Sequence, residues 1–334
     1  TDWRSLSAGT DTSILWDAGI ISHLTLDTRL SNYSATYSDP TSDPIDASRQ
    51  TVGLGISNEV LLLDDRVSLV AAARTEFLHG DRRDAPFMPA AGVIWRPYTW
   101  LTTKANVAYS HRVPDFDELY LKTGAVEGNS DLLPERSLGW DIGAVADSDN
   151  CPLGGGATFF QNDFYQTIRF VPVSAYRVRA RNLGGAFSRG LEIFANLKFR
   201  QRLHARAGYT WTDAALDTLP DRQIIHQPEH RARLDATVHL GDFTPFDKRN
   251  ALQFNDSGHY RGRVNLDNFG NLTNPPYIRV DAGITVSPEP WIRLGFNVRN
   301  ITNYRRGADS LQRPLPGRAY YGSLRLKQTW HLTR

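Results

Sequence analysis

Apolar and polar residues alternate along most of this chain. In the clearest runs, at 52–62, 203–212, 231–240, 278–286 and 292–299, nearly every second residue is aliphatic or aromatic. Most of the residues between them are Gly, Ser, Thr or Arg. A period of two residues is that of a β-strand with one apolar and one polar face. The pattern therefore predicts an all-β protein.

The alternation predicts about 15 antiparallel strands, with few helical patterns between them. We expect these strands at 11–18, 22–37, 50–63, 66–78, 87–96, 100–111, 138–148, 156–170, 176–199, 202–213, 229–241, 247–263, 276–287, 290–302 and 317–330. Short connections at 64–65, 96–99, 200–201 and 288–290 alternate with long ones at 38–50, 79–86, 113–137, 214–228, 264–275 and 303–316. Long strands with short turns at one end and long loops at the other are typical of a transmembrane β-barrel.

Composition agrees with a barrel and excludes several other classes. No run approaches the roughly 18 to 20 apolar residues of a membrane helix, and a mean hydropathy of -0.42 suits strands whose second face is polar. The net charge of +2 gives no basic surface for nucleic acid. The single cysteine, Cys151, excludes an intramolecular disulfide and a cysteine-based zinc cluster. The first residues have neither the basic nor the apolar part of a signal peptide, so we expect a removed leader or a chain that begins partway through a longer one.

The stretch 110–137, SHRVPDFDELYLKTGAVEGNSDLLPERS, lies between two predicted strands and is too long for a tight turn. It resembles the signature of the TonB-dependent outer-membrane receptors, an Arg-x-Pro-x-Phe-x-x-Leu-Tyr run followed by Gly-Asn-x-x-Leu-x-Pro-Glu. The matching residues are Arg112, Pro114, Phe116, Leu119, Tyr120, Gly128, Asn129, Leu132 or Leu133, Pro134 and Glu135. Near the C-terminus, Asn300 and the Pro316-Gly317-Arg318 run are similar to two further motifs of that family.

The resemblance implies a location in the outer membrane of a Gram-negative bacterium and a role in transport. It is nearest the cobalamin and siderophore receptors, which import a scarce small molecule. Family members form a 22-stranded barrel filled by a plug, and energy reaches them through TonB. Residues 1–334 match a single barrel region without the plug, equivalent to strands 8 to 22, and residues 1–10 would then lie outside the cell.

An open sheet would leave two unpaired edges in lipid, where unsatisfied backbone groups are costly. We therefore expect a second polypeptide, or a cleaved part of the same precursor, that carries the plug and the remaining strands. TonB would act through that partner. In the family the run from Phe116 to Tyr120 is structural, and the resemblance carries that role over to this loop.

Arginines on the polar face of the predicted strands are candidates for ligand binding. An anionic ligand such as a ferric siderophore would be attracted by such a basic wall. The alternative is that these arginines face the plug and pair with its acidic groups. The candidates are Arg177, Arg179, Arg181, Arg231, Arg233, Arg293 and Arg299, with Arg325 and Lys327 on the same face.

Asp39, Asp43 and Asp46 fall in one predicted extracellular loop. Clustered carboxylates can hold Ca²⁺, although their spacing fits no specific calcium loop and a solvated acidic loop is the alternative. The sequence predicts no cofactor other than this candidate ion.

Two other functions stay open at this point. A barrel without its plug could be a structural scaffold in an outer-membrane complex, or a passive porin, which would not need the signature loop. An enzyme is excluded, since no nucleophile elbow, phosphate-binding loop or metal triad is present. The carboxylates Asp115, Asp117 and Glu118 lie close together in the signature loop, but we interpret them as structural.

Overall fold

One long, curved antiparallel sheet makes up most of the computed structural model, which describes residues 2–17, 21–39, 42–148, 150–200, 202–240, 252–267, 270–289, 291–306 and 313–327. Fifteen strands follow one another in chain order, and β14 adds to β13. They are β1 (Asp2–Asp17), β2 (Ile21–Asp39), β3 (Ser42–Leu62), β4 (Val67–Gly80), β5 (Phe87–Tyr98), β6 (Leu101–Arg112), β8 (Glu135–Ala146), β9 (Leu153–Tyr165), β12 (Ala186–Phe199), β13 (Leu203–Leu216), β15 (His230–His239), β16 (Leu252–Arg261), β19 (Tyr277–Glu289), β20 (Ile292–Arg299) and β21 (Ala319–Leu326). The prediction of about 15 strands in an antiparallel barrel sheet is confirmed.

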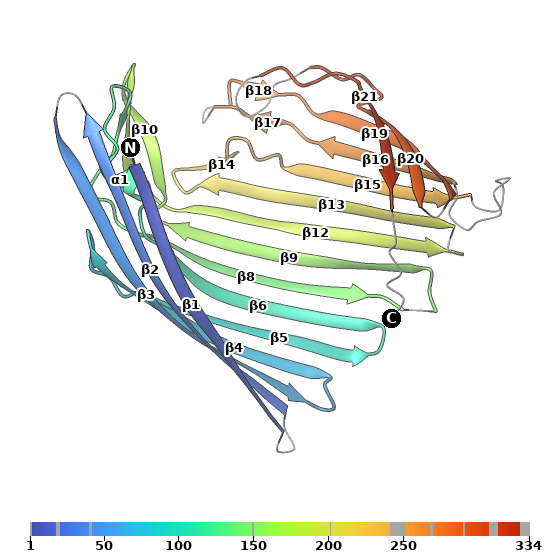
Figure 1. Cartoon of the computed structure of the whole chain (residues 1–334), viewed down its shortest axis with the longest axis horizontal. Coiled ribbons are helices and arrows are strands. Elements are labelled where there is room, and N and C mark those ends of the chain that lie inside the picture. The colour runs from blue at the N-terminus through green and yellow to red at the C-terminus, as the bar shows by residue number, and fades with distance from the viewer. Residues whose placement is uncertain are drawn as a thin grey trace, which may run out of the picture.

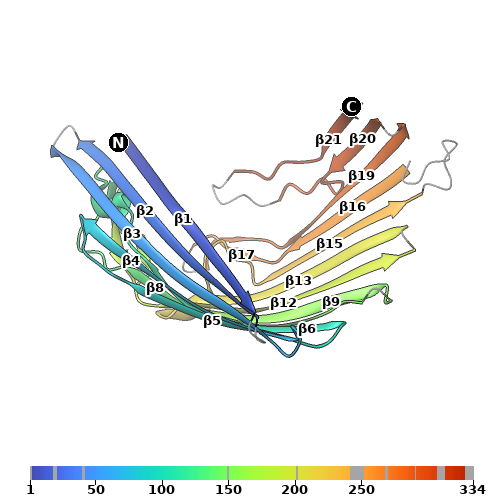
Figure 2. The same cartoon turned by 60° about the horizontal axis from the view of Figure 1, so that its bottom comes forward.

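The sheet is curved into an open gutter rather than a closed cylinder (Figures 1 and 2). In the hydrogen-bonded order β1 and β21 are the two end strands, and within the described part of the chain neither pairs with the other. Figure 2 shows them on opposite edges of the gutter. Among the described residues, no helix has the length and apolar character needed to cross a membrane.

The two ends of the strands differ in the length of their connections. At one end, which we call the turn rim, β3–β4, β5–β6 and β8–β9 are joined over 63–66, 99–100 and 147–152. At the other end, the loop rim, the connections 113–134, 166–185, 217–229, 262–276 and 300–318 are long. Except at the predicted loop 38–50, this is the alternation predicted from the sequence. β1 begins at the loop rim and β21 ends at the turn rim, since each strand reverses direction.

In the part of the chain that the structure describes, the helix and the strands other than the fifteen barrel strands lie at the loop rim. A short helix, α1 (Phe116–Tyr120), lies in the connection between β6 and β8. A separate three-stranded sheet is formed by β10 (Ile168–Ser174), β11 (Arg177–Asn182) and β7 (Val126–Glu127). β14 (Leu219–Gln223) pairs with the end of β13, and β17 (Val264–Asn265) pairs with β18 (Thr273–Asn274).

Cross-strand register separates the two faces along every strand. On β13 the apolar positions, such as Leu203 and Tyr209, have apolar partners on both neighbours, and we call this side the outer face. The polar positions, such as Arg206 and Thr210, face the inside of the gutter, which we call the lumen. Large apolar side chains remain exposed along the outer face, including Leu234, Phe254 and Leu294. An apolar face of this extent suits contact with lipid.

Three predicted boundaries are wrong. The segment 38–50 is not a long loop, because β2 continues to Asp39 and β3 begins at Ser42. Pro44 lies beside a register irregularity there, a place where a strand tolerates proline. The predicted strand 176–199 is two strands, β11 and β12, separated at Gly184-Gly185. The predicted strand 156–170 likewise divides into β9 and β10 at Gln166, whose φ is 56°.

Several lumen-facing glycines leave space that a neighbour fills. At Gly190, an added Cβ would lie 2.2 Å from the carbonyl oxygen of Trp211 and 2.7 Å from the ring of Phe160. At Gly208, on the next strand and the same face, it would meet nothing within 4 Å. The aromatic ring therefore lies against the sheet only because position 190 has no side chain.

This pair of glycines gives a matched test of packing. We expect Gly190→Ala to lower the free energy of unfolding of the assembled barrel by roughly 1–3 kcal/mol, the usual cost of overpacking. Gly208→Ala should change it by no more than about 0.5 kcal/mol. Denaturant unfolding in detergent measures both, and equal effects of the two substitutions would contradict this account.

Candidate functional site

The signature loop begins with α1, whose first turn is fixed by its own side chains. Asp115 is the N-cap residue, and its backbone N–H donates to Glu118 Oε2 at 2.8 Å. The N–H of Leu119 donates to the Asp115 carbonyl at 3.1 Å. The Glu118 carboxylate satisfies the N-cap amide, which the helix itself leaves without a partner. Burial raises the pKa of the Tyr120 hydroxyl at the helix end, and the Asp81 carboxylate raises it further, so this hydroxyl stays protonated.

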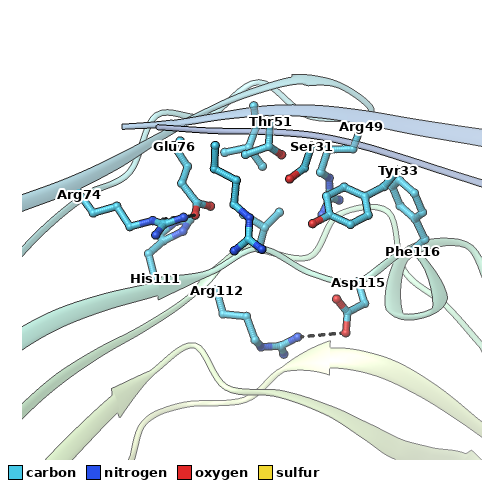
Figure 3. Close-up of a pocket in the computed structure, with 14 residues that line it drawn as sticks. Ser31, Tyr33, Arg49, Thr51, Arg74, Glu76, His111, Arg112, Asp115 and Phe116 are labelled. Carbon is cyan, nitrogen blue, oxygen red and sulfur yellow. Dashed lines mark hydrogen bonds and ion pairs between the residues drawn. The ribbon is translucent and has the colours of Figure 1, made fainter. Parts of the chain in front are cut away.

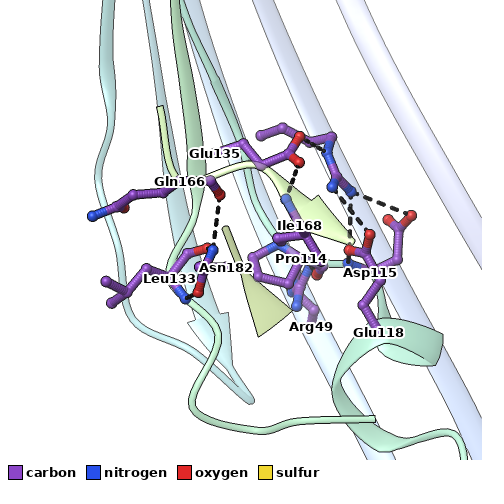
Figure 4. Close-up of polar contacts among 10 residues, drawn as sticks. Arg49, Pro114, Asp115, Glu118, Leu133, Glu135, Gln166, Ile168 and Asn182 are labelled. Atoms are coloured by element: carbon purple, nitrogen blue, oxygen red, sulfur yellow. Dashed lines mark hydrogen bonds and ion pairs between the residues drawn. The ribbon is translucent and has the colours of Figure 1, made fainter. Parts of the chain in front are cut away.

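Arg112, at the end of β6, joins the two halves of the signature through the carboxylates of Glu118 and Glu135, which are labelled in Figure 4. Its Nε donates to Glu135 Oε2 at 2.6 Å, and its two terminal nitrogens donate to the Glu118 carboxylate at 3.0 Å each. Glu135 Oε1 in turn accepts the N–H of Ile168 at 2.5 Å. One guanidinium therefore holds α1, the start of β8 and the start of β10 together, which a lysine with its single ammonium could not do.

Arg49 on β3 anchors the loop from the other side. Its Nη2 lies 2.6 Å from Asp81 Oδ2, and the two side chains are only 10% and 3% exposed. Its Nη1 donates to the carbonyl of the buried Pro114 at 3.0 Å. Its guanidinium also lies 4.9 Å from the centre of the Phe116 ring. This is a buried, fully engaged cation that fixes the loop to the wall of the barrel.

Apolar contacts complete the docking on two sides. Phe116 is 3% exposed and packs with Ala35, Tyr37 and Ala47 of β2 and β3. On the other side of the loop a second buried cluster joins α1 and the loop to β10 and β11. Its members are Leu119, Leu132, Ile168 and Ala180. Buried packing is therefore concentrated at the loop rim, not in a central core.

Asparagines fix the second half of the signature loop to the β10–β11 hairpin. Asn129 Nδ2 donates to the carbonyl of Ala180, and Asn182 exchanges hydrogen bonds with the backbone of Leu133. Gly128 is needed because an added Cβ would lie 2.7 Å from the backbone of Leu119. The family-motif residues of this loop are thus brought together, and Pro134 beside them is buried.

The C-terminal motif residues form a second assembly at the loop rim. Asn300 is 5% exposed and its side-chain amide donates to the carbonyls of Tyr304 and Pro316. The guanidinium of Arg318 donates to the carbonyl of Ile301. The backbone N–H of Arg318 donates to Asn303 Oδ1 at 3.0 Å. Gly317 lies under the Arg305 side chain, where an added Cβ would come within 2.4 Å of Nε. These residues close the connection between β20 and β21.

A cavity of about 370 Å³ lies below the signature loop, against β2, β3 and β4 (Figure 3). Three of its arginines have carboxylate partners: Arg49 with Asp81, Arg74 with Glu76 at 3.1 Å, and Arg112 as described above. Arg29, on the same wall, has no ion pair among the described residues. Hydroxyl groups of Ser31, Tyr33 and Thr51 line the rest of this wall.

A more basic surface covers the lumen face of β13, β15, β16 and β19, and we call it the basic wall. Two of its members, Arg231 and Arg233, were predicted from the sequence to face the lumen. Register places Arg261 across from Arg231, and His259 across from both Arg233 and Arg279. The basic wall comprises Arg206, Arg231, Arg233, His259, Arg261 and Arg279, with Glu192, Asp235 and Asp281 as its carboxylates.

Several cations of the basic wall have no carboxylate partner among the described residues. Arg233 pairs with Asp235 at 2.5 Å and Arg279 with Asp281 at 3.3 Å. Arg206 instead lies 5.7 Å from the centre of the Phe194 ring, and Arg261 lies 4.7 Å from that of Tyr277.

Two buried nitrogens of Arg261, Nε and Nη2, have no hydrogen-bond partner in the described part of the chain. Of the described residues, Arg231 donates only to the neutral Gln227. A cavity of about 400 Å³ is lined by Arg206, Arg231, Arg233 and His259. This surface can hold an anion.

Sequence reasoning missed part of the basic wall. Arg206 and Arg279 stood in recognised polar positions, so register alone could have included them. Arg261 lies in β16, where the alternation is interrupted by Asp256 and Gly258 on the apolar side. The lumen-facing positions of β16 are identified only by its pairing with β15 and β19, which the sequence of β16 alone does not show.

The other arginines predicted as ligand-binding candidates lie outside the basic wall. Arg177, Arg179 and Arg181 do not face the lumen from a barrel strand, because they belong to β11 of the loop sheet. Arg177 and Arg179 lie 3.8 and 3.6 Å from the Glu127 carboxylate of β7. Arg293 and Arg299 are on the lumen face of β20, where Arg299 lies 4.7 Å from the centre of the Tyr321 ring.

The described residues show no coordination geometry that supports the predicted calcium site. Asp46 lies on β3, is exposed and accepts a hydrogen bond from Thr36 at 2.8 Å. The side chains of Asp39 and Asp43 are outside the described part of the structure. In that described part, no group of three or more His, Cys, Asp or Glu residues is placed to hold a metal ion.

Residues 1–301 match the family model described as "TonB dependent receptor-like, beta-barrel". One curated relative is transferrin-binding protein A of Neisseria meningitidis serogroup B, 31% identical over 93 residues, which are 28% of this chain and 10% of that protein. The match is therefore local and carries no statement about the rest of that protein.

Solved structures with the same fold are siderophore receptors. A mutant of the ferric enterobactin receptor of Pseudomonas aeruginosa, in complex with enterobactin, is 18% identical with a TM-score of 0.80. It matches 97% of this chain and 54% of its own. The siderophore receptor PirA of Acinetobacter baumannii is 16% identical with a TM-score of 0.79, over 97% of this chain and 55% of its own. The chain thus spans about half the length of these receptors.

The Arg49–Asp81 pair supplies a test of how the loop is held. We expect Arg49→Met to destabilise the assembled barrel by about 3–5 kcal/mol, because it leaves a buried carboxylate without its cation. The double substitution Arg49→Met with Asp81→Leu should recover much of that loss. Unfolding in denaturant measures the two variants, and a double variant as unstable as the single one would count against the pair.

Proposed function

Because the chain belongs to the TonB-dependent receptor β-barrel family, we propose that it forms part of an outer-membrane receptor that imports an anionic iron–siderophore complex. The observation that carries this proposal is the basic wall, where arginines without carboxylate partners face the lumen beside aromatic rings. An anionic ligand would give these guanidinium groups the partners that the described chain does not provide.

The chemistry of the wall favours an aromatic anion over a simple inorganic one. Guanidinium groups that already stack on Phe194 and Tyr277 can accept a further planar ring, and they donate to oxygen anions at its edge. A catecholate siderophore combines both features around a ferric ion. Two of the solved relatives are an enterobactin receptor and a ferric-catecholate receptor, which agrees with this ligand class.

The open edges of the sheet support a larger assembly. The outward edges of β1 and β21 carry a row of backbone groups that no described strand satisfies. In lipid such groups have no water to bind, so further strands must close the barrel. We propose that these strands and a plug come from polypeptide beyond residues 1–334, and that TonB supplies energy through that part.

The same proposal gives the orientation of the barrel in the outer membrane. In outer-membrane barrels the long connections are extracellular and the short turns are periplasmic. The loop rim, with α1 and the β7–β10–β11 sheet, would then face the outside. The Arg112 and Arg49 contacts would hold these loops open above the lumen and leave the basic wall accessible to a ligand.

Binding of ferric enterobactin to the purified, assembled receptor tests the ligand class. We expect Arg231→Gln and Arg261→Gln each to weaken binding by about 10-fold or more, because a hydrogen bond to a charged group contributes about 1.5–3 kcal/mol. Arg189→Gln, which removes an exposed arginine paired with Asp213 on the outer face, is the control and should leave binding unchanged.

Two results would contradict the proposal. Unchanged affinity in both lumen variants would remove the basic wall from the binding site. A barrel that binds no ferric siderophore and co-purifies in fixed proportion with other outer-membrane proteins would favour the scaffold role. Mass spectrometry of the complex identifies the polypeptide that completes the barrel, and a closed barrel made of this chain alone would refute the need for one.

A further inference from the structure

One carboxylate stands at mid-height on the apolar face of the sheet. Asp256 lies on β16 between Phe254 and Gly258, the residues that share its side of the strand. Its cross-strand partners are Ala236 on β15 and Ala282 on β19, both of which belong to the outer face. Asp256 is exposed and has no hydrogen bond or ion pair among the described residues.

The position of Asp256 along the barrel axis also distinguishes it from the other charged residues of the outer face. β16 has outer positions at Leu252, Phe254, Asp256, Gly258 and Tyr260, so the carboxylate occupies the middle one. The other Arg, Lys, Asp and Glu side chains that the described strands place on the outer face are toward the loop rim: Arg4, Asp46, Arg136, Asp163, Arg189 and Asp213. Asp256 is therefore the one charged group at mid-height on the described outer face.

A depression begins at Gly258, the next outer position on β16 after Asp256, which does not itself line it. It has a volume of about 450 Å³ and crosses from β12 to β19 on the outer face. Small residues form its floor, among them Ala195, Ala207, Ala232 and Gly258. Larger side chains surround it, including Ile193, Tyr209, Leu234, Tyr260 and Ile278. An added Cβ at Gly258 would meet nothing within 4 Å, so the depression is open at the position next to Asp256.

We propose that this depression and Asp256 form a docking surface, within the membrane, for a segment of a different protein that carries Lys or Arg beside a bulky apolar side chain. Ionisable groups at membrane depth are costly in lipid and normally have a partner. The cation would meet Asp256, and the bulky side chain would fill the depression over Gly258. This inference rests on the proposed location of the outer face in lipid.

Charge complementarity selects the occupant. A second copy of this chain offers no cation at mid-height on its described outer face, so it could not neutralise Asp256. Lipid chains could fill the depression but would leave the carboxylate without a donor. A protein segment with a basic residue satisfies both parts of the surface, and nothing in the lumen or at the loop rim is involved.

The test is site-specific photo-crosslinking of the assembled receptor in native outer membranes. A photoreactive residue replaces Ala236, the cross-strand neighbour of Asp256, or Ala105, a control on the outer face of β6 whose partners are Val93 and Ile142. We expect a protein adduct at position 236 whose crosslinked peptide contains Lys or Arg. Position 105 should give lipid adducts only.

Variants of Asp256 give the decisive comparison. Asp256→Leu should remove at least nine-tenths of the protein adduct at position 236, whereas Asp256→Glu should retain it. Asp256→Leu makes the outer face more apolar, so the barrel should stay folded and should still bind ferric enterobactin. A protein adduct that persists in Asp256→Leu, or lipid adducts alone at position 236, would overturn the docking surface while leaving the proposed import function intact. Absence of lipid adducts at position 105 would overturn the membrane location and the docking surface together.

Discussion

The backbone hydrogen bonds of the sheet are the constraint on which the rest of this structure depends. Hydrocarbon offers no substitute for a missing partner, so each spanning strand must pair along its length with both neighbours. The thirteen strands between β1 and β21 meet this demand by pairing in chain order, whereas β1 and β21 each have one paired edge in the described part of the chain. Once the pairing is set, alternation decides each residue's environment, and a shift of one position would exchange the lipid and lumen faces.

A single-layer sheet has no second layer to pack against, and this explains where buried residues are found. The clusters around Phe116 and Leu132 are at the loop rim, where a folded-back loop supplies the missing layer. The loop is polar, so its docking also requires charged groups with well-placed partners. Arg112 and Arg49 meet that requirement through carboxylates and a backbone carbonyl, and a single donor of different shape could not replace either.

The sequence predicted the fold class, the number of strands and the alternation of short and long connections, because period two is a local signal. It also identified residues of the signature loop itself, such as Arg112 and Glu135, because the resemblance includes both halves of that motif, but it did not identify Arg49 and Asp81, which hold the loop from outside the motif. It failed where local signals conflict with pairing. The polar run around Asp43 and Pro44 suggested a loop, yet pairing with β2 extends the strand through it. The alternating Arg177, Arg179 and Arg181 suggested a lumen wall, yet the glycines at 184–185 place them in a separate sheet.

The two faces of β16 illustrate what pairing adds to pattern. Arg261 and Asp256 are five residues apart on one strand, and their register assigns one to the lumen and the other to the outer face. On the lumen side a cation is surrounded by other cations and lacks an anion. On the outer side an anion is surrounded by apolar side chains and lacks a cation. Neither Arg261 nor Asp256 has a partner of opposite charge within the described chain. The partner missing at Arg261 is an anion in the lumen, and the partner missing at Asp256 is a cation on the outer face. A lumen ligand cannot serve the outer group, and a membrane partner cannot serve the inner one, so the same strand presents two independent recognition surfaces.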